Sequence, residues 1–326
     1  MRPGAVALTI GDPNGIGPEI AVKAAVASAQ QSDSAPVILV GDRFVIAHYA
    51  ERFTAGLPLL AFDDPTTHTG ALRYRAVDAL PRSAFRPGAG SAESGRATVA
   101  YVEAALDLIA AGHARSIVGC PHSETAVNAA GIRFSGYPSL LARLTNVAED
   151  EVFLMLVGAG LRIVHVTLHE QLSGALQRIT PDLIERVVRT TIDALRKFGI
   201  ARPRLGVFGI NPHAGEDGLF GDDDDRIVRP LVARLKAEGL DLEGPVGADL
   251  MLGQPGFDAF VAMYHDQGHI PIKLLAGRNS AAMSIGAGLM FSSVGHGCAF
   301  DIAGQGVADA GPVHRCIRLV AGASEL

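Results

Sequence analysis

Tryptophan is absent from the 326-residue sequence, and aromatic residues make up only 6% of it. Proteins that hold single-stranded nucleic acid stack its bases on aromatic side chains, so this composition argues against such a platform. The formal net charge is −6, with 28 Lys and Arg against 34 Asp and Glu. A modest acidic balance supplies no basic surface for a phosphate backbone, and we expect no nucleic-acid partner.

Cysteine is also scarce. Cys120, Cys298 and Cys316 are far apart in the sequence and form no CxxC pair, which excludes a thiolate metal site and favours a reducing compartment over a disulfide framework. The first apolar run is too short for a signal peptide, and no run approaches the length of a membrane helix. We therefore expect a cytoplasmic protein with no membrane partner.

The hydrophobic content of 48% indicates a well-packed globular protein, and the length suits two domains or one large one. Short apolar runs alternate with longer stretches of helical periodicity, which predicts an α/β fold with a mostly parallel sheet. Thr180 is expected to cap one of the helices. The predicted strands are 6–10, 37–40, 116–120, 152–157, 161–166, 205–210 and 259–264, and the predicted helices are 17–28, 97–111 and 181–198.

Three histidines follow three of the predicted strands. His169, His213 and His265 each stand where the chain leaves the sheet, beside polar or acidic neighbours. Ligands of open α/β sheets bind outside the carboxyl ends of the strands, and three imidazoles with open positions are typical of a catalytic metal site. Ordinary loop histidines remain the alternative. His165, inside its strand, is expected to pack or to orient a ligand.

Other residues carry weaker signals. Lys273 follows His265 by eight residues and could move a proton near a bound metal, and Asp249 is a second polar candidate. Both also suit a plain surface role. Residues 11–19, GDPNGIGPE, form either a structural turn or an anion contact at a helix start. The acidic run at residues 222–225 is expected to be a solvated helix start.

Seven ordered motifs make the chain resemble the 4-hydroxythreonine-4-phosphate dehydrogenase (PdxA) family along nearly its whole length: GDPNGIGPEI, NAAGIRFSGY, VTLHE, INPHAGE, GPVGAD, MYHDQGHIPIK and SVGHGCAFDIAGQGVAD. The resemblance implies two α/β/α domains around a largely continuous sheet, similar to the isocitrate and isopropylmalate dehydrogenases. The nicotinamide-cofactor side is expected at residues 1–130 plus 292–326. The metal-binding and dimerisation domain is expected at 131–291.

The resemblance also implies an activity and its site. It implies an oxidoreductase that oxidises a secondary alcohol with NAD or NADP and then decarboxylates the product. It implies a homodimer whose shared metal sites use His169, His213 and His265, with Lys273 and Asp249 as catalytic residues. The metal is one divalent ion from among Zn, Mg, Mn, Co, Ni and Fe. The expected cofactor-binding residues are Gly295, His296, Gly297 and Asp301.

Several positions depart from the biosynthetic enzymes of this family. Their GHTE corresponds to residues 136–139 here, Gly-Tyr-Pro-Ser, and their His-Lys pair corresponds to Ser123 and Glu124. Ala282 and Phe291 stand where they carry Asn and Arg near the substrate phosphate. Phe cannot supply the bidentate guanidinium contact that phosphate recognition uses, so Phe291 favours an apolar or ring-shaped substrate.

At these positions the chain resembles the terephthalate dihydrodiol dehydrogenases, a subgroup of the family. That resemblance implies a small-molecule substrate, 1,2-dihydroxy-3,5-cyclohexadiene-1,4-dicarboxylate, converted to protocatechuate and CO2, with Tyr137, Ser139 and Phe291 at the substrate. A 4-hydroxythreonine-4-phosphate or related phospho-sugar-acid dehydrogenase is the alternative within the family. A metal-dependent hydrolase using the same histidines, and a non-catalytic binding protein, are alternatives of other classes.

Overall fold

The computed structural model describes residues 4–31, 34–54, 56–63, 70–277 and 280–322. The chain divides into two compact units: unit 1 is Met1–Leu140 with Met290–Glu325, and unit 2 is Leu141–Leu289 with the terminal Leu326. The sequence-based boundaries lay after residues 130 and 291, and the units divide after Leu140 and Leu289. The functions expected of the two domains stay predictions.

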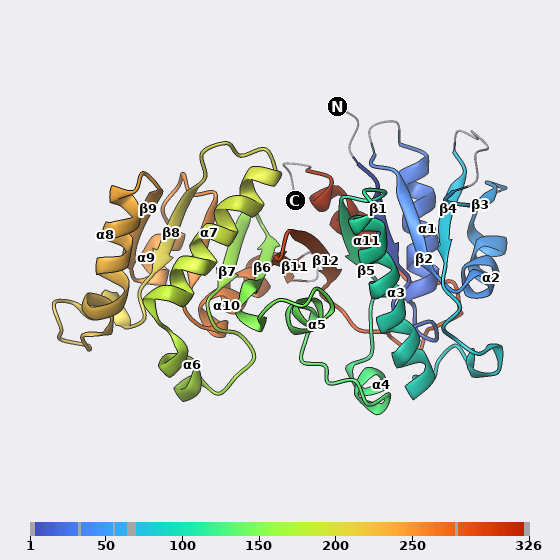
Figure 1. Ribbon diagram of the computed structural model, residues 1–326, viewed down its shortest axis with the longest axis horizontal. Helices are drawn as coiled ribbons and strands as arrows, with labels where there is room; N and C mark the ends of the chain where they lie inside the picture. Colours follow the sequence, from blue (N-terminus) through green and yellow to red (C-terminus); the bar gives the residue numbers. More distant parts are fainter. Residues whose placement is uncertain (1–3, 32–33, 55, 64–69, 278–279, 323–326) are drawn as a thin grey trace. The chain divides into compact units, whose positions relative to one another are not determined.

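Unit 1 is built on parallel strands. Each strand pair described in it is parallel, in the order β3-β4-β2-β1-β5-β12. Helix α3 packs on β1, β2 and β5, and α11 packs on α1 and β5 (Figure 1). The strands are β1 (Val6–Thr9), β2 (Val37–Gly41), β3 (Leu59–Ala61), β4 (Leu72–Ala76), β5 (Ser116–Gly119) and β12 (Leu289–Val294). The helices are α1 (Gly17–Ala29), α2 (Arg43–Phe53), α3 (Ala92–Ala110), α4 (Glu124–Ala129), α5 (Tyr137–Leu144, which crosses the unit boundary) and α11 (Gly311–Val320), with the 3₁₀ turn η1 (Arg82–Ala84).

Unit 2 has a mixed sheet in the order β11-β6-β7-β10-β8-β9. The pairs β11/β6 and β6/β7 are antiparallel, and the remaining pairs are parallel. Its strands are β6 (Val152–Gly158), β7 (Leu161–His165), β8 (Arg204–Phe208), β9 (Asp241–Val246), β10 (Ala259–Ala262) and β11 (Ala281–Gly286). Its helices are α6 (Leu172–Arg178), α7 (Pro181–Lys197), α8 (Arg229–Ala237), α9 (Ala248–Leu252) and α10 (His265–Ala276), with the short turns η2 (Glu149–Glu151), η3 (Pro212–Gly215) and η4 (Asp224–Val228).

One face of the unit 2 sheet is covered by α9 and α10. Ile272 of α10 and Met251 of α9 pack into a cluster with alternate residues of the strands, including Ile163 and Phe260. Ile272 and Met251 are fully buried, and each buried side chain of this size contributes about 1.5–3 kcal/mol. This packing fixes α10 against β7, which matters for the site because α10 begins at His265.

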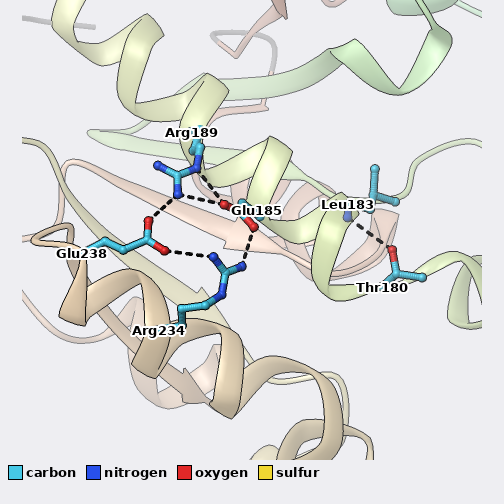
Figure 2. Close-up of polar contacts among 6 residues, drawn as sticks. All are labelled: Thr180, Leu183, Glu185, Arg189, Arg234 and Glu238. Carbon is cyan, nitrogen blue, oxygen red and sulfur yellow. Dashed lines mark hydrogen bonds and ion pairs between the residues drawn. The ribbon is translucent and has the colours of Figure 1, made fainter.

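Helix α7 is fixed at its start and along its exposed side. The Thr180 hydroxyl accepts the backbone N–H of Leu183, which confirms the predicted cap (Figure 2). Two arginines and two glutamates then form a closed ring of ion pairs between α7 and α8: Glu185, Arg189, Arg234 and Glu238 (Figure 2). These side chains are partly exposed, so solvent screening limits what each pair contributes.

The α/β class, the seven predicted strands and the three predicted helices are confirmed, with shifts of a few residues at their ends. Five further strands were missed: β3, β4, β9, β11 and β12. Among the described residues, no helix combines the length and the apolar composition that a membrane crossing requires.

Candidate active site

The histidine segments leave the sheet of unit 2 at one edge. β10 lies between β7 and β8 and is parallel to both, so the three carboxyl ends are neighbours. His169 follows β7, His213 follows β8, and His265 opens α10 after β10. The three segments therefore begin at neighbouring strand ends, and the metal-binding role expected of the three histidines stays a prediction.

Three imidazoles form a group that could hold a metal ion. His169, His265 and His269 each offer one ligand atom, and these atoms lie within 4.8 Å of one another. The rings of His265 and His269 are stacked with their centroids 3.6 Å apart and an interplanar angle of 13°. His169 is exposed and the other two are half-buried. An all-nitrogen donor set of this kind suits Zn, Co, Ni or Fe.

His213 does not belong to this group in the described residues. Its side chain is 64% exposed, and Nδ1 lies 3.6 Å from a carboxylate oxygen of Glu216. His213 stands in η3 with a left-handed backbone, φ 54°, and Ala214 follows with φ 52°. Non-glycine residues rarely adopt this conformation, and such local strain gathers at functional sites.

A buried carboxylate anchors the segment that leads to His213. Asp224 is fully buried, and its two oxygens accept the backbone N–H groups of Ile210 and Asn211 at 2.8 and 2.9 Å. The expectation that the acidic run is a solvated helix start is wrong for this residue. A carboxylate can replace the missing strand partners of two backbone N–H groups, and Asp224 does so here.

His269 was missed by sequence reasoning. The available signal was its spacing from His265, because residues four apart share one face of a helix. Its Nδ1 lies 3.1 Å from Nε2 of His165, a buried residue at the end of β7. Burial and the neighbouring His269 lower the pKa of His165 to about 3, and burial and His265 lower the pKa of His269 to about 4. Both rings are neutral at pH 7, as a metal ligand must be.

A cleft of about 300 Å³ lies beside this group in unit 2. One wall comes from the start of α10 and the residue before it, and the other from the segment that follows β7. The lining residues are Leu168, His169, Glu170, Leu172, Ala175, Tyr264, His265 and Asp266. The cleft places two of the candidate ligands in the wall of a small-molecule-sized space.

The two proposed catalytic residues lie at different places in unit 2. Lys273 is exposed on α10, two helical turns beyond His265, and its Nζ donates to the Ser280 hydroxyl at 3.1 Å. Asp249 is exposed in the first turn of α9. A Cβ at Gly247 would lie 2.8 Å from Oδ1 of Asp249 and 3.8 Å from the Cα of His213, so Asp249 lies near the His213 turn.

The expected cofactor loop of unit 1 follows β12. Gly295, Gly297 and Asp301 are exposed, and Nδ1 of His296 lies 3.2 Å from the Gly297 carbonyl. A Cβ at Gly297 would meet nothing within 4 Å, so this part of the loop faces open space. An extended ligand could approach the backbone closely there.

Buried charges of α1 hold the other end of this loop. The Glu19 carboxylate is fully buried and accepts the backbone N–H groups of Gly306 and Ala308 at 3.0 and 2.9 Å. Lys23 pairs with Glu19 at 2.7 Å and donates to the carbonyls of the same two residues. Sequence reasoning left residues 11–19 open between a turn and an anion contact. The contacts of Glu19 favour the structural role.

The residues expected at the substrate form a buried aromatic cluster in unit 1. Phe291 is fully buried and Tyr137 is 5% exposed, with ring centroids 4.3 Å apart. His122 packs on Tyr137 and Phe134, and burial lowers its pKa to about 4. Ser139 is half-buried and donates to the Gly136 carbonyl at 3.1 Å. The cluster contains no guanidinium group.

The sheets, the imidazole group and the glycine loop together define an α/β protein with a candidate metal centre and a separate candidate cofactor loop. Residues 33–320 match the family described as "Pyridoxal phosphate biosynthetic protein PdxA". The chain belongs to this family, and it is a dehydrogenase, an oxidoreductase.

Named relatives lie on more than one branch of the family. The chain is 44% identical to 1,2-dihydroxy-3,5-cyclohexadiene-1,4-dicarboxylate dehydrogenase of Comamonas sp, over 97% of this chain and 96% of that one. The solved structure of a terephthalate 1,2-cis-dihydrodiol dehydrogenase from Burkholderia xenovorans LB400 matches with 51% identity and a TM-score of 0.77, covering 98% of each chain. A 4-hydroxythreonine-4-phosphate dehydrogenase from Burkholderia phymatum matches with 35% identity and a TM-score of 0.85, covering 99% of this chain and 98% of that one.

Proposed function

We propose that this chain is a metal-dependent, NAD- or NADP-linked dehydrogenase that oxidises 1,2-dihydroxy-3,5-cyclohexadiene-1,4-dicarboxylate and releases CO2 to give protocatechuate. The observation that carries the proposal is the aromatic packing around Phe291, where phosphate-binding members of the family carry Arg. The names of the relatives at 44% and 51% identity support the same substrate class.

The donor groups fit the two cofactors that this activity needs. His169 and His265 would hold the divalent ion, together with His213 from the turn after β8. Gly295, His296, Gly297 and Asp301 would hold the nicotinamide cofactor. When bound, the nicotinamide supplies a hydride acceptor and the ion supplies Lewis-acid polarisation of a carbonyl oxygen.

In the proposed reaction, side chains must transfer protons and orient the reacting groups. Oxidation at C2 of the diol removes a hydride and the hydroxyl proton, and we assign that proton to Lys273. The product is a β-keto acid, which loses CO2 from C1, and its oxygen is then reprotonated. The aromatic ring that results makes the sequence favourable. Asp249, near the His213 turn, is assigned to orientation of the reacting groups.

Tyr137, Ser139 and Phe291 are proposed to shape the substrate region. Phe291 and Tyr137 are buried, so their proposed role is to make the packing behind the substrate region apolar. They also leave this cluster without a guanidinium group that could bind a phosphate. A phosphorylated hydroxy acid would find no such partner in this cluster.

We further propose a homodimer that completes the metal site with histidines of both subunits. Two observations support it. His213 is 64% exposed and lies outside the imidazole group of its own chain. Among the described residues, eight of the nine exposed large hydrophobic side chains belong to unit 2, on α6, α9, α10 and the 219–220 turn. Light scattering coupled to size exclusion tests this, and a monomer at micromolar concentration would contradict it.

The cytoplasmic location stays a prediction.

One assay separates the candidate functions. The purified protein is incubated with NAD⁺ or NADP⁺, a divalent metal, and either the cis-dihydrodiol of terephthalate or 4-phosphohydroxy-L-threonine, and nicotinamide reduction is followed. Turnover of the diol with release of CO2 is expected. Turnover of the phosphorylated substrate alone would replace the proposal with the biosynthetic activity. Metal-dependent hydrolysis without nicotinamide reduction would favour the hydrolase.

A further inference from the structure

His269 occupies a position in unit 2 that its hydrogen bonds define closely. It lies four residues after His265 on α10, with the two rings stacked, and one of its nitrogens belongs to the ligand group with His169. Each imidazole has two nitrogens, and a metal ion can bind only one that carries no proton. The hydrogen-bond partners of His165, His265 and His269 decide which nitrogen that is.

His165 sets the first tautomer. Its Nδ1 lies 3.1 Å from the backbone carbonyl oxygen of Leu154. A carbonyl oxygen only accepts, so Nδ1 of His165 carries the proton and donates. The residue is fully buried, which keeps the ring neutral, and its Nε2 is therefore an acceptor.

His269 takes its tautomer from His165. Nδ1 of His269 lies 3.1 Å from the accepting Nε2 of His165 and 3.3 Å from the backbone oxygen of His265. Both neighbours accept, so Nδ1 of His269 carries a proton. In the neutral ring, Nε2 of His269 then has the free lone pair.

His265 reaches the same state through a carboxylate. Its Nδ1 lies 2.7 Å from Oδ1 of Asp266 and donates to it, so its Nε2 is free. The two stacked rings of α10 thus present equivalent nitrogens. A carboxylate or carbonyl behind a metal-bound histidine is the usual device for fixing its tautomer, and here another imidazole fills that place for His269.

Gly268 is the residue that permits this contact. A Cβ at this position would lie 2.3 Å from Nε2 of His165 and 2.9 Å from its Cε1. Any side chain there would push α10 away from the end of β7. The close approach of the helix to His165 therefore depends on the glycine in HDQGH.

We propose that His269 is a ligand of the metal ion through Nε2, and that His165 is a positioning residue that holds His269 in the binding tautomer. This rests on the metal dependence in the proposed function and adds a ligand to it. The consequence is a more nitrogen-rich site that prefers Zn²⁺ or Co²⁺ to Mg²⁺ or Mn²⁺.

Calorimetric titration of the chelator-treated full-length protein tests the ligand. Replacement His269→Leu is expected to weaken Zn²⁺ binding by about 100-fold and Mg²⁺ binding by less than about threefold, and to change the visible absorption of bound Co²⁺. His113→Leu, an exposed histidine of unit 1, is the matched control and should leave all three unchanged. Unchanged Zn²⁺ affinity and an unchanged Co²⁺ spectrum in His269→Leu overturn the proposal.

Two variants of His165 test its positioning role. His165→Gln keeps one donor for the Leu154 carbonyl and one acceptor for His269, whereas His165→Leu keeps neither. The glutamine variant should stay within about threefold of wild-type Zn²⁺ affinity, and the leucine variant should lose about 10- to 100-fold. Equal losses in both variants would overturn the positioning role.

A measurement on the unmutated protein covers the case of variants that fail to fold. With ¹⁵N-labelled histidine, the apo protein should show a protonated Nδ1 and a bare Nε2 for His269, and Zn²⁺ should shift Nε2. A protonated Nε2, or no response to Zn²⁺ while His265 responds, overturns the inference alone. Failure of wild-type protein to bind any divalent ion, with full turnover in chelator, overturns the proposed function itself.

Discussion

Units 1 and 2 each have a candidate site at the carboxyl end of parallel strands, and the two candidate sites are built differently. In unit 1 the candidate site is a glycine-rich backbone loop. The ion pair of Glu19 and Lys23 stabilises this loop, because Glu19 accepts hydrogen bonds from its backbone. In unit 2 the candidate site is a set of side chains on a helix start and a loop, and other imidazoles and carboxylates orient them. A loop site depends on backbone support, whereas a ligand site depends on individual nitrogen atoms.

The largest expected effect comes from unit 2. Replacement His265→Ala should lower kcat/KM for the proposed substrate by about 1,000-fold or more, because Lewis-acid stabilisation contributes several kcal/mol. The free energy of unfolding in chelator should change by less than about 0.5 kcal/mol, since His265 is half-buried and outside the core. Steady-state kinetics and urea titration measure the two, with His113→Ala as control. Comparable activity of the variant would break the assignment.

Unit 1 should respond in the reverse manner. Replacement Glu19→Gln removes a buried charge that pairs with Lys23 and accepts two backbone N–H groups, and it should lower the free energy of unfolding by about 2–4 kcal/mol. The loosened loop should also raise KM for the nicotinamide cofactor more than it lowers kcat. The exposed Glu103→Gln on α3 is the control. If the cofactor KM is unaffected, the loop has another role.

The pH dependence of stability sharpens the same comparison. Burial lowers the pKa of His122 to about 4, so the unfolded chain, with a histidine pKa near 6.5, binds the proton first. The contribution of His122 is therefore fully present above about pH 6.5 and is lost as the pH falls toward 4, by about 2 kcal/mol after allowance for partial exposure. His122→Phe should remove this part of the acid sensitivity. Urea titrations at pH 7 and pH 5 measure the free energy of unfolding of both proteins. An equal loss of unfolding free energy between the two pH values in wild type and variant would contradict the prediction.

The smallest effect is expected at the exposed ion-pair ring of unit 2 (Figure 2). Arg234→Ala removes two ion pairs, while Glu185 and Glu238 keep their pairs with Arg189. Because Arg234 is also 49% exposed, the free energy of unfolding should fall by only about 0.5–1 kcal/mol. Raising the salt concentration should shrink the difference between variant and wild type. A loss as large as that of Glu19→Gln would erase the distinction between buried and exposed charges.

Local pattern was sufficient for much of the fold. The predicted strands are buried apolar runs, and α7 has both a cap and an apolar stripe, so period and propensity agree there. β11 contains two Ala, one Ser and one Gly, and β12 contains two adjacent Ser, and these residues carry weak strand signals. β11 forms because it pairs antiparallel with β6, a contact between distant segments that no local pattern reports.

The site was predictable only in part. Strand ends placed His169 and His265, because topology brings the ends of parallel strands together. His269 and Glu19 depend on neighbours that are remote in sequence, His165 and the 306–308 segment. Asp224 likewise looked like part of a solvated acidic run, and only the fold shows that it is buried beneath the His213 segment.

The strand order of unit 2 has a consequence for synthesis. β10 is the last in the chain of the three strands that lead to the candidate histidines, yet it lies between β7 and β8 in the sheet. A growing chain that ends before residue 259 has a gap where the central strand belongs and lacks the first residue of α10. The imidazole group therefore cannot assemble before this part of the chain has been synthesised. On the proposed function, the metal ion can be captured only after β10 and the start of α10 have been synthesised.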